Sequence, residues 1–151
     1  MQDLINCLEQ DHDLARTLMN YFKSTEVTFA QKRKHFDKFS ALILNHIKSE
    51  EDAVYTPSRV LKNPRIHNLI HTGLQQHFMI RNSITRLKAV AVEQAWSSEF
   101  SNLNELIEFH LDEEESEFFP ELKRSFSKEQ FDSVTEHYYK LNESNPEPGF
   151  I

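Results

Sequence analysis

The feature that most constrains this chain is an internal repeat of polar residues, spaced by 64 or 65 positions. Each half carries one His-x-x-x-Arg motif and one His-x-x-x-Glu-Glu-x-x-x-aromatic motif, followed by a proline. The matched residues are His12 with His77, Arg16 with Arg81, His46 with His110, Glu50 with Glu114, Glu51 with Glu115, and Tyr55 with Phe119. Such a repeat predicts two similar halves that, packed face to face, bring four histidines and two glutamates near a pseudo-twofold axis.

Apolar residues recur with the 3.6-residue period of a helix along most of the chain. The periodic segments predict helices over about residues 3–23, 25–55, 64–91, 96–120 and 127–141. We expect Pro57 and Pro120 to end the second and fourth helices, because an interior proline removes a hydrogen bond and clashes with the preceding turn. The predicted fold class is all-α. Residues 1–122 would form an up-down-up-down four-helix bundle, and residues 123–151 an additional short C-terminal helix and tail packed on or trailing it.

Composition excludes several classes of protein. The chain has 17 Lys and Arg against 24 Asp and Glu, a net charge of −7, which argues against a nucleic-acid partner. Its two glycines are too few for a turn-rich β fold. The single cysteine, Cys7, excludes an internal disulfide framework and fits a reducing compartment. Without an apolar run of about 18 residues or a signal peptide, the chain is expected to be cytoplasmic and to have no membrane partner.

Two His-x-x-x-Glu pairs lie where apolar residues would otherwise continue helical stripes. Residues four apart project side by side from a helix. A buried carboxylate without a partner costs several kcal/mol, so two inward-facing glutamates need cations. Imidazole and carboxylate groups bind iron, manganese or zinc in the cores of helix bundles. The predicted metal ligands are His12, His46, Glu50, His77, His110 and Glu114.

The residues beside this set are assigned supporting positions around the predicted ligands. Glu51 and Glu115 are rotated by about 140° from the preceding histidines, so we expect them at the surface or as partners of the ligands. Arg16 and Arg81 are one helical turn from their histidines and are candidates to pair with these or other acidic residues. Tyr55 is assigned to packing at the end of the bundle.

The spaced set of four histidines and two glutamates resembles the hemerythrin-like proteins of the HHE cation-binding family. The similarity covers roughly residues 3–122. It implies a non-haem di-iron centre in which Glu50 and Glu114 bridge two iron ions, Fe²⁺ or Fe³⁺, with a bridging oxo or hydroxo group. The four histidines would be terminal ligands. Zinc or manganese could occupy the same ligands.

Two positions depart from the pattern of the oxygen-carrying hemerythrins. Gly73 stands where those proteins have a fifth histidine, and Glu114 replaces an aspartate one residue further on. The pattern is closer to the iron-centre repair proteins and to the iron-sensing hemerythrin domain of an F-box protein. We expect Gly73, on the core stripe one turn before His77, to open a small-molecule pocket beside one iron and thus to take part in ligand binding.

Three functional hypotheses follow. In the first, the chain is a di-iron protein that reacts with O2, NO or peroxide as a sensor, scavenger or iron-handling protein. In the second, it is a reversible O2 carrier or storage protein, which would use the same ligands. In the third, the polar core pairs internally, and function lies in surface contacts. No nucleophile with a base and no phosphate-binding loop is visible in the sequence, so any activity would be redox chemistry at the metal centre and not conventional enzymatic hydrolysis.

Overall fold

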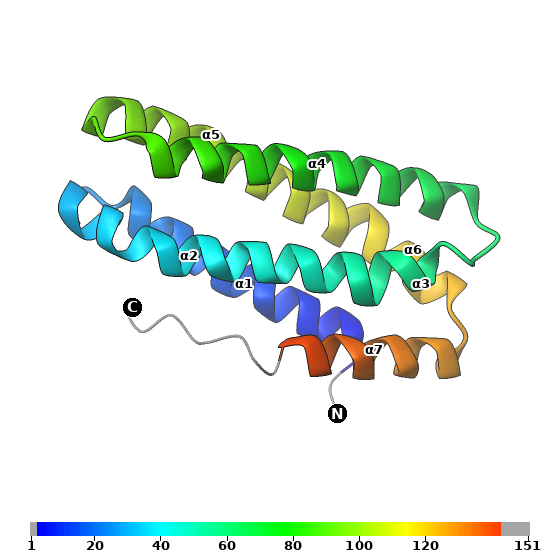
Figure 1. Ribbon diagram of the computed structural model, residues 1–151. Helices are drawn as coiled ribbons and strands as arrows, with labels where there is room; N and C mark the ends of the chain where they lie inside the picture. Colours follow the sequence, from blue (N-terminus) through cyan, green and yellow to red (C-terminus); the bar gives the residue numbers. More distant parts are fainter. Residues whose placement is uncertain (1–2, 143–151) are drawn as a thin grey trace.

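The computed structural model describes residues 3–142, and within this range the secondary structure is entirely helical, which confirms the all-α prediction. Figure 1 shows long helices running side by side. The elements are α1 (Leu4–Lys23), α2 (Phe29–Glu50), η1 (Glu51–Tyr55), α3 (Thr56–Ser58), α4 (Pro64–Ala89), α5 (Glu93–Glu113), η2 (Glu114–Phe118), α6 (Phe119–Ser125) and α7 (Lys128–Asn142). The predicted tail after residue 142 lies outside the described residues.

Local sequence signals explain where the helices begin. The Asp3 side chain accepts a hydrogen bond from the Asn6 backbone and caps α1. Thr28 and Gln31 form a reciprocal capping box, so α2 begins four residues later than predicted. At the start of α7, Gln130 donates from its backbone to the Ser127 hydroxyl, and its side chain accepts from the Ser127 backbone. These caps satisfy backbone donors that a helix start would leave unpaired.

The second and fourth helical segments do not end at their prolines, which corrects the prediction. The helix continues through Pro57 to Ser58 and through Pro120 to Ser125. In both cases a π-helical turn, η1 or η2, precedes the proline. The residue just before each proline bonds to a carbonyl five positions back, at Glu51 or Glu114. The backbone hydrogen bonds therefore change register just before each proline. Proline has no N–H to donate, and its position coincides with this break in the regular i to i−4 hydrogen bonds.

The core consists of two apolar clusters separated by a polar layer. One cluster joins the aromatic side chains Phe22, Phe36, Phe39, Trp96 and Phe100 with aliphatic residues of α1, α2, α4 and α5. The other joins the beginning of α1 and of α4 with η1, η2, α6 and α7. The repeated histidines and glutamates lie between the two clusters along each helix. Apolar packing on both sides therefore holds these polar side chains in place.

The C-terminal helix α7 packs against α1, α2 and η1. In Figure 1 it lies along the side of the molecule formed by α1 and α2, away from α4. Its buried residues, Val134, Thr135 and Tyr138, face the rest of the protein. Within residues 3–142, none of the helices combines the length and the apolar character needed to span a membrane.

Candidate metal centre

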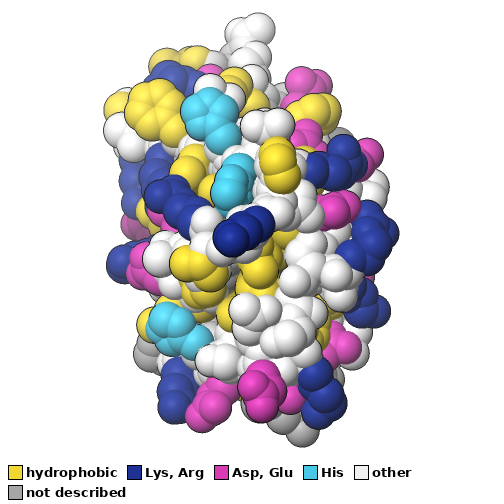
Figure 2. Space-filling view, turned by 90° about the vertical axis from the view of Figure 1, so that its right-hand side faces the viewer, with side chains coloured by type: hydrophobic (Ala, Val, Ile, Leu, Met, Phe, Trp, Pro, Cys, Tyr) yellow, Lys and Arg dark blue, Asp and Glu magenta, His cyan; other side chains and the backbone are white. Residues whose placement is uncertain are grey.

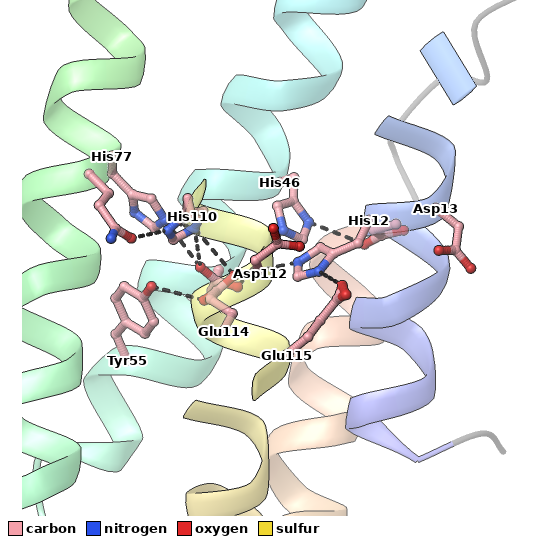
Figure 3. Close-up of polar contacts among 12 residues, drawn as sticks. His12, Asp13, His46, Tyr55, His77, His110, Asp112, Glu114 and Glu115 are labelled. Carbon is pink, nitrogen blue, oxygen red and sulfur yellow. Dashed lines mark hydrogen bonds and ion pairs between the residues drawn. The ribbon is translucent and has the colours of Figure 1, made fainter. Parts of the chain in front are cut away.

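The six predicted ligands meet in the polar layer, although they come from α1, α2, α4, α5 and η2. Figure 3 shows the four histidines and Glu114 directed toward one another. All except His46 are at most 3% exposed, and the His46 side chain is 12% exposed. Two overlapping groups have ligand atoms close enough to hold a metal ion. One group is His12, His46, Glu50 and Glu114, and the other is Glu50, His77 and His110.

The first group contains four buried polar atoms that lack a hydrogen-bond partner. These atoms are His12 Nε2, His46 Nε2, Glu50 Oε2 and Glu114 Oε1. His12 Nε2 and Glu114 Oε1 are only 3.4 Å apart, and His46 Nε2 and Glu50 Oε2 are 3.8 Å apart. Each unsatisfied buried polar group costs about 1–3 kcal/mol, and more if it is charged. A cation among these four atoms would satisfy all of them, so the donor set fits a metal ion.

The second group has the spacing of ligands on one ion. His77 Nε2 lies 3.1 Å from Glu50 Oε1 and 3.0 Å from His110 Nε2. Two donors bound at right angles about 2.1 Å from a metal would be about 3 Å apart. Glu50 belongs to both groups, and Glu114 Oε1 lies 3.2 Å from His110 Nε2. Both carboxylates are therefore placed between the two groups.

Each of the four histidines has a partner on its Nδ1 atom. His12 Nδ1 is 3.0 Å from Glu115, and His77 Nδ1 is 2.7 Å from Glu51. The other two contacts join His46 Nδ1 to Asp11 at 3.3 Å and His110 Nδ1 to Gln76 at 2.6 Å. A partner on one ring nitrogen sets the orientation of the ring and leaves the other nitrogen free for a metal. All four Nε2 atoms are thereby directed to the centre.

These outer contacts follow the sequence repeat. Arg16 donates two hydrogen bonds to Glu115, at 3.0 Å each, and Arg81 donates two to Glu51, at 2.9 and 3.1 Å. The prediction that these arginines pair with these glutamates is confirmed. Burial raises the pKa of Glu51, but hydrogen bonds from His77 and Arg81 outweigh it and lower the pKa to about 2. Both glutamates therefore remain ionised beside the histidines that they orient.

In the protein without metal, the two central carboxylates draw protons onto their histidine neighbours. Burial lowers the pKa of His12, but the adjacent carboxylates of Glu114 and Glu115 raise it to about 9. Burial likewise lowers the pKa of His110, and the negative charge of Glu114, with Oε1 3.2 Å from His110 Nε2, raises it to about 10. A metal ion would have to displace these protons, because a metal-bound histidine nitrogen is unprotonated.

Tyr55 also contacts the centre, whereas the sequence analysis assigns it to packing at the end of the bundle. Its ring stacks on His77 with centroids 5.3 Å apart, and its hydroxyl donates to Glu114 Oε2 at 3.0 Å. In a regular α-helix Tyr55 would be rotated about 140° from Glu50. The wider π turn of η1 brings it to the same side. Burial and the charges of Glu114 and Glu50 raise the pKa of Tyr55 well above its usual value, so it is a neutral donor.

The role expected for Gly73 needs correction. A Cβ atom added there would lie 2.9 Å from Cζ of Tyr55 and closer still to its hydroxyl. The space that the sequence analysis assigns to a small-molecule pocket is thus filled by the Tyr55 ring. Glycine is favoured at this position because a Cβ atom would force the Tyr55 ring to move.

Three further contributors to the centre were missed by sequence reasoning. Asp11 immediately precedes His12, and Gln76 immediately precedes His77, so the repeat itself contained a signal for this pair. Tyr138 carried no such signal, because it lies in α7, outside the repeat. Its hydroxyl lies 2.8 Å from His46 Nδ1 and donates to Asp11. The C-terminal helix is thereby tied directly to a predicted ligand.

The remaining surface carries no comparable cluster in the part of the chain that the structure describes. Figure 2 views the end of the molecule where α3 and α6 end and shows histidines among interspersed charges of both signs. His67, His71 and His137 are exposed. They are separate from the buried set.

Comparison with known proteins agrees with the geometry of the polar layer. The family model described as hemerythrin HHE cation binding domain matches residues 3–122, which include all six predicted ligands. Searches of curated proteins and of solved structures found no significant match. The matched range covers most of the chain but leaves out α7. The protein belongs to the hemerythrin HHE cation-binding domain family.

Proposed function

We propose that the polar layer is a non-haem di-iron centre. One iron would be held by His12, His46, Glu50 and Glu114, and the other by His77 and His110 with the same two glutamates as bridges. The observation that carries this proposal is the group of four unsatisfied buried atoms facing one another. Internal ion pairing, the third hypothesis from the sequence, would join His12 to Glu114 at 3.4 Å and His46 to Glu50 at 3.8 Å, contacts in which none of these four atoms makes a hydrogen bond.

We further propose that the centre reacts with O2, NO or peroxide, and that the protein acts as a sensor, scavenger or iron-handling protein. When bound, iron supplies reversible one-electron chemistry and open coordination positions for small ligands. The chain's own residues would fix the ligand rings through their Nδ1 partners. Apolar clusters on both sides would keep bulk water from the ligands. Tyr55 would hold a proton at its hydroxyl, in contact with Glu114.

The architecture we infer for this function is an up-down-up-down four-helix bundle made by α1, α2, α4 and α5, with α7 added at one side. The π turns would extend α2 and α5 beyond their glutamates. We expect residues 1–122 to form the metal-binding unit and residues 123–151 to be an addition to it. We propose a cytoplasmic protein without nucleic-acid or membrane partners, on the basis of its single cysteine and negative charge.

The test is anaerobic loading of the full-length chain with Fe²⁺, removal of unbound metal, and measurement of iron content and the optical spectrum before and after exposure to air. We expect about two irons per chain. Glu50→Gln should hold less than half of this amount, because Glu50 belongs to both ligand groups. Glu105→Gln, an exposed position on α5, is the matched control and should bind normally.

Two results would overturn the proposal: no iron in the unaltered protein, or equal iron content in Glu50→Gln. Zinc or manganese bound in place of iron would preserve the metal centre but refute the reactivity. Spectral changes that reverse under argon would favour the O2 carrier over the reactive protein. Irreversible oxidation on exposure to air would favour the reactive protein.

A further inference from the structure

A cavity of about 200 Å³ lies beside the polar layer, on the side away from Gly73. Its walls are mostly aliphatic side chains from α1, α2, α4 and α5, including Ala15, Ile43, Ile80 and Ile107. Gly73 and Tyr55 are not among its lining residues. The cavity is therefore distinct from the pocket predicted beside Gly73.

One wall of this cavity consists of predicted metal ligands. His12, His46 and His110 all line it. Four other lining residues, Asp11, Leu14, Leu42 and Asn142, are only partly buried. The cavity thus lies between the histidine side of the centre and partly exposed residues of α1, α2 and α7.

The volume exceeds what a diatomic ligand needs. One water molecule occupies about 30 Å³ of liquid, and an apolar cavity of about 150 Å³ in another protein accommodates benzene. A space of about 200 Å³ therefore matches a molecule of roughly six to nine non-hydrogen atoms. The lining also includes Asp11 and Asn142, but eight of its thirteen residues are aliphatic, which favours an uncharged molecule over a charged one that would lose most of its hydration there.

We propose that this cavity binds a small uncharged apolar molecule, such as a monocyclic arene or a branched hydrocarbon of similar size, against His12, His46 and His110. This inference goes beyond the proposed reactivity and does not depend on it, because the aliphatic walls are present whether or not a metal is bound. It assigns the protein a second binding site, adjacent to the metal centre.

The test uses the full-length chain, both as purified and after removal of metal with a chelator. Binding of 4-fluorotoluene is followed by fluorine NMR, and a rise in the melting temperature that saturates with ligand gives a second readout. Ala15→Leu places three extra carbons in the cavity and should weaken binding at least tenfold. Ala41→Leu makes the same change at an exposed position on α2 and should leave binding unaltered.

A second variant, Ile43→Ala, tests the same cavity if Ala15→Leu does not fold. Ile43→Ala enlarges the cavity and should shift preference toward the larger 1-fluoronaphthalene by at least threefold. Saturable binding in the unaltered protein, with both variant effects, would support the site. Absence of binding, or binding that neither variant changes, would overturn it. Either result is independent of iron content, because the metal-free protein is measured as well.

Discussion

Replacing Gly73 with alanine has two opposing effects on stability: a gain in helix propensity and a collision with the Tyr55 side chain. Within a helix, alanine is favoured over glycine by about 0.5–1 kcal/mol, so helix propensity alone predicts that Gly73→Ala stabilises α4. The structure predicts the reverse. The new methyl group would lie 2.9 Å from Cζ of Tyr55 and closer to its hydroxyl, and that ring is held between His77 and Glu114.

The magnitude follows from what must move. Forcing a methyl group into a filled core site costs about 1–3 kcal/mol. Displacing the Tyr55 hydroxyl also removes its hydrogen bond to Glu114, and a hydrogen bond to a charged group contributes about 1.5–3 kcal/mol. After the gain in helix propensity is subtracted, we expect Gly73→Ala to lower the free energy of unfolding by about 2–4 kcal/mol.

Urea unfolding of the metal-free protein measures this cost without a contribution from metal binding. Gln75→Gly and Gln75→Ala, at an exposed position two residues later in α4, measure the propensity difference in the same helix. A double-mutant cycle with Tyr55→Phe isolates the contact, because it removes the hydroxyl that the methyl group meets first. In that background Gly73→Ala should cost at least about 1 kcal/mol less. If Gly73→Ala instead stabilises the protein by the amount found at position 75, the contact has no energetic role and the reasoning is wrong.

Three further predictions concern the partners of the centre. Glu51→Gln and Glu115→Gln should each weaken metal binding by about 10–100-fold in a competition titration, since both glutamates orient ligand histidines; normal affinity would refute this role. The free energy of unfolding of the metal-free protein should fall as pH rises from 6.5 to 10, because the pKa values of His12 and His110, about 9 and 10, lie above their ordinary value of 6.5. Urea unfolding at several pH values checks this, and a rise over that range would contradict it. Tyr138→Phe should lower the free energy of unfolding by about 1–3 kcal/mol, measured in the same way, since it removes a buried hydrogen bond to a carboxylate; no change would refute the link between α7 and the centre.

The candidate ligand residues that meet in the polar layer could be chosen from the sequence because the choice depends on helical period. His46 and Glu50 are one turn apart on an apolar stripe, and the repeat places the same pair at His110 and Glu114. Hydrogen bonding within a helix fixes which residues share a face, so a pattern in the chain indicates which side chains turn inward. The all-helical fold was predictable for the same reason.

The prediction that the helices end at Pro57 and Pro120 was wrong. A π-helical turn before each proline adds one residue to the helical turn, and the spacing of apolar residues in the sequence does not reveal such a turn. The π turn of η1 brings Tyr55 to the centre, and the Tyr55 ring fills the space beside Gly73. The 3.6-residue period shows which face of a helix a residue occupies only where the backbone hydrogen bonds keep the regular α-helical register.

The sequence by itself indicated which histidines and glutamates lie in the polar layer and that they come in two matched sets. Only the tertiary structure decided which atoms meet. The pairing of His12 with Glu115 and of Tyr138 with Asp11 joins residues 103 and 127 positions apart. The cavity beside the histidines likewise depends on five helices, α1, α2, α4, α5 and α7. The physical reason is that the period of one helix is a local property, whereas contacts between helices and the spaces among them depend on how whole side chains pack.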